Sequence, residues 1–140
     1  MAKTLLKGCI VQVDDSAGTL RNISTDVESV EIEYSAPGED VTGLTETVIN
    51  YIPGQTVVSV TLNLFYNSAA TTGSWTVVRG IIGSSTSKTV SVQPEGTGLT
   101  LSGEYMCEGV SISATPKSAG KLGSVKFLPM GSTAPSWLIS

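Results

Sequence analysis

Residues 57–65 read Val-Val-Ser-Val-Thr-Leu-Asn-Leu-Phe, and this stretch decides the fold class. Its side chains alternate strictly between apolar and polar. The apolar face holds Val58, Val60, Leu62 and Leu64, and the other face holds Ser59, Thr61 and Asn63. Strict period-two alternation rich in β-branched residues is typical of a strand with one buried face. Nine extended residues span roughly 30 Å, so we expect this strand to be the central strand of a β-sandwich or barrel.

Similar runs lie on both sides of this strand, separated by clusters of Gly, Pro, Asp and Ser. We expect further strands over residues 9–14, 19–23, 27–34, 86–93, 99–115 and 122–128. A helix over 25–30 is the alternative to the start of the third run, but the spacing of Val30 and Ile32 favours a strand. In the 99–115 run the apolar residues switch from odd to even positions at Glu108-Gly109, which predicts a β-bulge there. After the bulge, Val110 and Ile112 are expected to face inward.

One short helix is expected over about 74–82, with Ser74 as its amino-terminal cap and Gly83 in a left-handed conformation at its end. Together these elements predict an all-β fold. It is a sandwich or barrel of about seven or eight strands with one flanking helix, in a single domain over 1–140.

Residues 35–55 interrupt the series of strands. Pro37-Gly38-Glu39-Asp40 and Gly43 show no apolar periodicity, alternation resumes over 46–51, and a turn follows at Pro53-Gly54. Long connections of this kind are functional or disordered, and the Thr and Val content favours an ordered loop or hairpin arm.

The two termini are expected to be short interaction arms, over 1–7 and 129–140. The second contains Pro135 and Trp137, and an exposed Trp on a tail is typical of a contact site. The first nine residues lack an apolar core, so we expect neither a signal peptide nor a membrane anchor. Cys9 and Cys107 are expected to be reduced thiols, with cross-strand pairing left open.

The charge is low in amount and uneven in placement. The chain has 12 acidic and 8 basic residues, a net charge of −4. Nine of the acids lie between residues 14 and 46, where Arg21 is the only basic residue. Scattered Lys and Arg argue against nucleic acid as a tightly held ligand. The acidic segment is either a solvated face or a surface that repels polyanions.

Charged residues make up only 14% of the chain, and a weakly charged surface suits extensive subunit contacts.

Catalytic chemistry lacks its usual parts. The chain has no His, which excludes Ser-His-Asp and Cys-His machinery and imidazole metal sites. The carboxylate pairs Glu31/Glu33 and Glu104/Glu108 have the spacing of neighbours on a solvated strand. Asp14-Asp15 and Glu39-Asp40 lack the spacing of a calcium loop. We therefore expect no enzyme activity, no metal site and no cofactor.

The order of elements resembles the tail tube (major tail) proteins of tailed bacteriophages and the related contractile-tail and type VI secretion tubes. The resemblance covers roughly residues 8–130. It is carried by Cys9–Val13, Leu20-Arg21-Asn22-Ile23-Ser24, Val27–Tyr34, Pro37–Gly43, Tyr51-Ile52-Pro53-Gly54, Val57–Phe65, the helix at Trp75–Ile82, Leu99–Ala114 and Lys126-Phe127.

The resemblance implies a virion structural protein, assembled in the host cytoplasm, that forms stacked hexameric rings with copies of itself and with other tail proteins. DNA transits the lumen without tight binding. The family lumen is usually acidic, and like charge prevents adhesion of a duplex. We expect the lumen to be faced by some of the candidate acids Glu31, Glu33 and Glu46. The residues expected to contact a neighbouring subunit are Pro37, Gly38, Glu39, Asp40, Val41, Thr42, Tyr51 and Pro53. Ring stacking is expected to use Pro135 and Trp137.

Other roles fit the same sequence. Tube-capping, head–tail completion and capsid decoration proteins of phages use similar sandwiches. A carbohydrate-binding or adhesin module is the alternative from another class. It needs aromatics exposed on one face, whereas most of the eight aromatics here are predicted to point inward.

Overall fold

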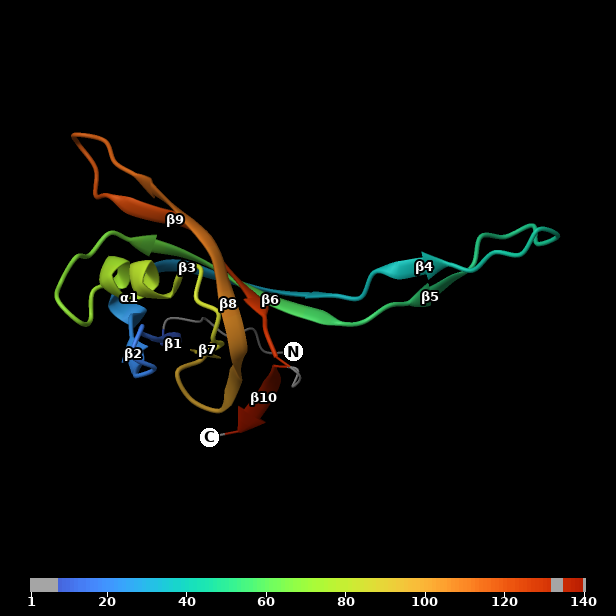
Figure 1. The fold of residues 1–140 in the computed structure, drawn as a ribbon, viewed down its shortest axis with the longest axis horizontal. Helices are drawn as coiled ribbons and strands as arrows, with labels where there is room; N and C mark the ends of the chain where they lie inside the picture. The colour runs from blue at the N-terminus through green and yellow to red at the C-terminus, as the bar shows by residue number, and fades with distance from the viewer. Residues whose placement is uncertain (1–7, 132–134, 140) are drawn as a thin grey trace.

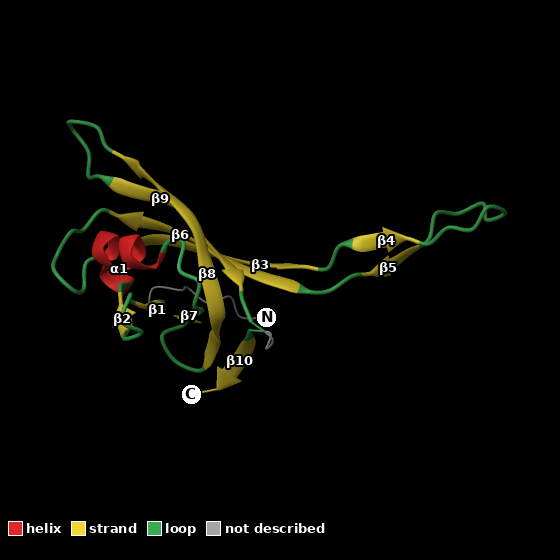
Figure 2. Cartoon of the chain, in the orientation of Figure 1, coloured by secondary structure: helices red, strands yellow, loops and turns green. Residues whose placement is uncertain are grey.

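The computed structural model describes residues 8–131 and 135–139. These residues form one antiparallel sheet of eight strands, a separate two-stranded ribbon and one short α-helix (Figures 1 and 2). The order in the large sheet is β2-β1-β7-β8-β9-β6-β3, and β10 pairs with β8 outside this path. The elements are β1 (Ile10–Asp14), β2 (Leu20–Asn22), a 3₁₀ turn (Ser24–Asp26), β3 (Val27–Ser35), β4 (Gly38–Asp40), β5 (Tyr51–Pro53), β6 (Val57–Phe65), α1 (Ser74–Ile81), β7 (Lys88–Gln93), β8 (Leu99–Ser113), β9 (Lys121–Pro129) and β10 (Ser136–Ile139). The predicted all-β fold with one flanking helix is confirmed.

Strand β6 buries the face that its alternation predicted. Val60, Leu62 and Leu64 are fully buried, and Val58 is 5% exposed. The strand lies between β9 and β3, however, so β8 and β9 are nearer the middle of the sheet. The prediction of a central position was wrong because an alternating pattern reports one buried face and not the number of strands on either side.

Helix α1 covers the core from one side and packs against β8 and β1. Its buried side chains are Val77, Val78 and Ile81. The predicted left-handed residue at its end is confirmed, since Gly83 has a φ of 76°. The predicted cap is wrong: Gly73 occupies the cap position, and the Ser74 hydroxyl donates to the carbonyl of Phe65 at 2.6 Å.

The long hairpin of β8 and β9 departs from the prediction after its bulge. The ladder shifts register between Cys107 and Gly109, which confirms the bulge. Beyond it Val110 still packs on the core, but Ile112 is 52% exposed. The inward prediction for Ile112 was wrong because the end of β8 and the start of β9 leave the body as a projecting hairpin (Figure 1).

Candidate functional site

The candidate sites among the described residues are surface features. Within residues 8–131 and 135–139, no three His, Cys, Asp or Glu side chains group together as metal ligands. No helix in this part of the chain is long and apolar enough to cross a membrane. Cys9 and Cys107 are free thiols, and burial raises the pKa of Cys107 to about 11. The three features to consider are a projecting arm, the outer face of the sheet and the carboxyl-terminal strand.

The arm, residues 36–56, is a hairpin that continues the β3–β6 pair. Gly38, Glu39 and Asp40 of β4 pair with Pro53, Ile52 and Tyr51 of β5. The alternation predicted over 46–51 becomes a strand only from Tyr51 onward. Figure 1 shows the arm extending well away from the body.

Hydrogen bonds within the arm hold its shape. The backbone N–H of Val41 donates to the carbonyl of Asn50 at 2.9 Å, and that of Asn50 donates to the Thr42 hydroxyl at 2.8 Å. Bonds from Thr42 to the Asp40 carboxylate lower the pKa of Asp40, so this carboxylate is held in place and charged. At the tip, the side-chain amide of Asn50 donates to Glu46.

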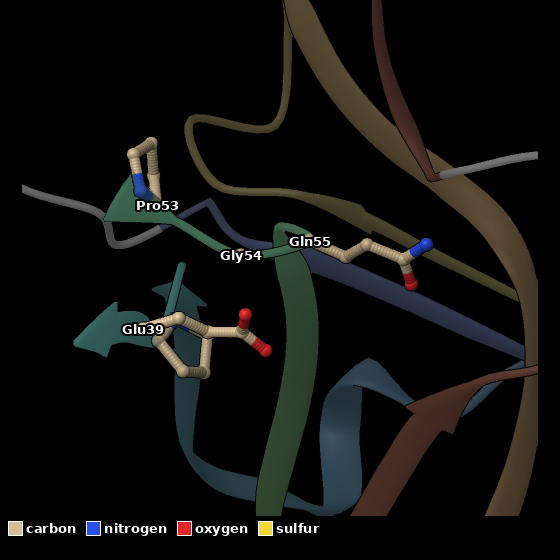
Figure 3. Close-up of a pocket in the computed structure, with 5 residues that line it drawn as sticks. Glu39, Pro53, Gly54 and Gln55 are labelled. Atoms are coloured by element: carbon tan, nitrogen blue, oxygen red, sulfur yellow. The ribbon is translucent and has the colours of Figure 1, made fainter. Parts of the chain in front are cut away.

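The root of the arm is a tight approach of two chain segments. The N–H of Gly54 donates to the carbonyl of Pro37 at 2.6 Å, and a Cβ on Gly54 would lie 2.7 Å from that oxygen. A larger residue therefore does not fit at Gly54. Pro37, Glu39, Pro53, Gly54 and Gln55 line an open hollow here, in which Glu39 and Gln55 direct their polar ends to the same side (Figure 3).

The arm exposes a large number of apolar side chains. None of its residues is buried. Six of its apolar residues are at least 47% exposed: Val41, Leu44, Val48, Ile49, Tyr51 and Ile52. An isolated two-stranded ribbon is marginally stable in water, and a contiguous exposed apolar surface marks an interaction site. The arm therefore has the composition of a segment that is covered by a partner.

The outer face of the sheet, opposite the core, is polar and acidic around β3. Glu31 and Glu33 are exposed and lie opposite Thr61 and Ser59 of β6. Thr61 in turn lies opposite Lys126 of β9, which is also exposed. Glu46 is not on this face, because it lies at the tip of the arm. The structure thus brings together two of the three acids predicted to face a lumen, and it adds one lysine to the same face.

The carboxyl-terminal strand folds back onto the sheet of its own subunit. In β10, Trp137 pairs with Leu101 of β8 and its Nε1–H donates to the hydroxyl of Tyr34. Pro135 lies against Gly103, where a Cβ would come within 2.7 Å of the Pro135 side chain. This close contact at Gly103 was not predicted from the sequence. A Gly at an inward position of an otherwise apolar alternation was the signal, because it marks a close approach.

The aromatic side chains are more exposed than predicted. Tyr34, Tyr51, Phe65, Tyr66 and Trp137 are all at least 36% exposed, so the prediction that most of the eight point inward was wrong. These residues lie at strand ends or on the arm, where parity does not imply burial. They are dispersed: Tyr51 is on the arm, Tyr34 bonds Trp137, and Tyr66 lies on Trp75 with ring centres 6.0 Å apart. They do not form one flat platform for a sugar.

Comparison with known proteins gives a likeness in structure only. No family model matches the chain, and no curated protein matches it. Its fold matches chains of gene transfer agent particles. One is from the tail of an empty gene transfer agent particle with C6 symmetry. Its TM-score is 0.73 at 15% identity, and the match covers 99% of each chain. Another is from the virion of a native particle, with a TM-score of 0.72 at 14% identity over 96% of this chain and 99% of that one.

Proposed function

We propose that this protein is a virion structural protein of a phage-like tail. It assembles with copies of itself into stacked hexameric rings that form a tail tube, in contact with other tail proteins and built in the host cytoplasm. The observation that carries the proposal is the fold match over nearly the whole chain to chains of gene transfer agent particles, one of them a tail with C6 symmetry. No catalytic role is proposed for the chain.

The arm supports self-assembly. Its six exposed apolar side chains gain stability only when another surface covers them. The residues proposed to contact a neighbouring subunit are Pro37, Gly38, Glu39, Asp40, Val41, Thr42, Tyr51 and Pro53, all of which lie in or beside β4 and β5.

The outer sheet face supports a channel for DNA. We place Glu31 and Glu33 on the lumen and assign Glu46 to the arm instead. Carboxylates repel the phosphates of a transiting duplex, and the hydroxyl of the half-buried Thr61 does not bind it tightly, while Ser59 beside it is only 7% exposed. Lys126 adds one positive charge to this face, so each subunit presents a weakly negative surface there.

The carboxyl-terminal strand has one edge on β8 and its other edge open among the described strands. An open edge is a template for pairing with another chain. We therefore propose that Pro135 and Trp137 take part in ring stacking.

Negative-stain electron microscopy of the purified protein tests the proposal. Tubes or six-fold rings are the expected result. Discrete monomers or trimers at all protein concentrations would contradict it and favour a capping, head–tail completion, decoration or carbohydrate-binding role.

A further inference from the structure

The molecule has two projections of opposite charge. The arm contains Glu39, Asp40 and Glu46 and no Lys or Arg. The tip of the β8–β9 pair, residues 111–123, contains Lys117 and Lys121 and no acid. We call this second projection the basic hairpin. Figure 1 shows the arm and the basic hairpin pointing away from opposite ends of the body.

The basic hairpin combines its charge with apolar surface. Residues 111–119 are all exposed, and Ile112 is 52% exposed. At its base Lys121 Nζ lies 3.0 Å from a carboxylate oxygen of Glu28 and 5.8 Å from the ring centre of Phe65. Phe65 and Tyr66 are 36% and 44% exposed. Ile112 pairs with the buried Leu122, and Tyr66 lies on Trp75 of α1, so both are on the helix side of the sheet, whereas Phe65 and Lys121 lie on the other side. The basic hairpin therefore offers Lys117 near its tip and exposed apolar side chains on its helix side.

The arm has the complementary composition. Its tip offers Leu44, Val48 and Ile49, which are between 62% and 106% exposed, beside the carboxylate of Glu46. Apolar area contributes affinity, and opposite charges fix orientation and select the partner. The two surfaces match in both respects.

The arm and the basic hairpin of one chain cannot meet, because they extend from opposite ends of the body (Figure 1). The partner must then be a second copy. A contact between two different surfaces of identical chains is heterologous, and its repetition generates rings or filaments.

We propose that the arm of one subunit docks on the basic hairpin of a neighbouring subunit. The carboxylate of Glu46 faces Lys117, while Leu44, Val48 and Ile49 cover Ile112 and Tyr66. Lys121 keeps its ion pair with Glu28, so Lys117 is the cation on which recognition depends most. This inference rests on the proposed self-assembly and adds the surface that receives the arm.

The test is a charge exchange between two proteins. The arm variant carries Glu46→Lys, and the hairpin variant carries Lys117→Glu. Each alone brings like charges together at every arm–hairpin contact. We expect its pelletable assemblies to fall at least about tenfold below wild type. When the two variants are mixed, every contact that joins one variant to the other has opposite charges. The mixture should co-assemble to within about twofold of wild type.

Two controls keep the result interpretable. Arg79→Glu reverses an exposed charge on helix α1, outside both surfaces, and should assemble like wild type. Circular dichroism and thermal unfolding of the dispersed variants should match wild type, because all substituted residues are exposed.

A second measurement reads the contact directly. Tubes grown from a mixture of ¹⁴N- and ¹⁵N-labelled wild-type chains are treated with a carbodiimide that joins carboxylates to lysines. Cross-links from Glu46 to Lys117 that pair a light with a heavy peptide are the expected result.

The outcomes separate this inference from the proposed function. If wild type forms neither rings nor tubes, the self-assembly proposal itself fails. If wild type assembles but the mixed variants do not, or if Lys117 cross-links only to other parts of the chain, the docking proposal is overturned and self-assembly stands.

Discussion

Replacement of Tyr105 with phenylalanine should stabilise the subunit, although Tyr105 is among the largest buried residues. Its side chain is fully buried, and none of the described residues offers its hydroxyl a hydrogen-bond partner. A buried, unpaired hydroxyl costs about 1–3 kcal/mol of stability. Its removal leaves a void smaller than a methyl group, which costs less than about 1 kcal/mol. We therefore expect Tyr105→Phe to raise the free energy of unfolding by about 1 kcal/mol, or Tm by about 4 °C.

The assay is urea unfolding followed by circular dichroism, at protein concentrations where size-exclusion chromatography shows dispersed subunits. The slope of unfolding free energy against urea should not change, since the exposed area on unfolding is the same. Tyr66→Phe is the matched control: Tyr66 is 44% exposed, so the substitution should change stability by less than about 0.5 kcal/mol.

The difference should widen at alkaline pH. Burial, and secondarily the charge of Tyr34, raises the pKa of Tyr105 from 10.0 to about 12. Tyr105 therefore ionises more readily in the unfolded chain than in the folded one. The free energy of unfolding of the wild type is unaffected by this below pH 10 and falls as the pH rises toward 12. The phenylalanine variant lacks this group, while Cys107 titrates alike in both proteins. Destabilisation by Tyr105→Phe, or parallel pH profiles above pH 10, would refute the reasoning and mean that the hydroxyl is bonded.

Three further predictions concern the tail and the arm. Gly103→Ala should displace β10 and speed amide hydrogen exchange over 99–102 and 136–139, because the new Cβ would lie 2.7 Å from Pro135. The control Gly109→Ala should leave exchange unchanged, because a Cβ there has nothing within 4 Å. Equal exchange rates in the two variants would contradict this packing. Replacement of residues 37–42 by a short Gly-Ser link should leave the unfolding midpoint of dispersed subunits unchanged, since none of these residues is buried. The same variant should assemble poorly in pelleting assays. Normal assembly would mean that the arm is merely solvated. Deletion of residues 131–140 should leave folded subunits that polymerise poorly, because it removes the strand paired to β8. Normal tubes from the truncated protein would contradict a role of this segment in stacking.

The sequence predicted the core better than the surfaces. The alternation of Val60, Leu62 and Leu64 indicated their complete burial, because period-two patterning reflects packing within one subunit. Gly83 was likewise readable, since a glycine after an apolar run marks the left-handed end of a helix.

The arm could not be read in the same way. Ile49, Tyr51 and Ile52 have the apolar content of a buried strand, yet all are at least 50% exposed. A residue destined for an interface between subunits has the same chemistry as a core residue, so one chain's pattern does not say which partner buries it. The fold of β10 onto β8 was missed for a related reason: a four-residue strand is too short to show a period.

Cryo-electron microscopy of the assembled protein tests the central claim most directly. We expect a tube of stacked six-fold rings in which Glu31 and Glu33 face the channel and each arm reaches another subunit. A channel lined by Lys126 and apolar side chains, or a protein that stays dispersed under all conditions that assemble tail tubes, would contradict it.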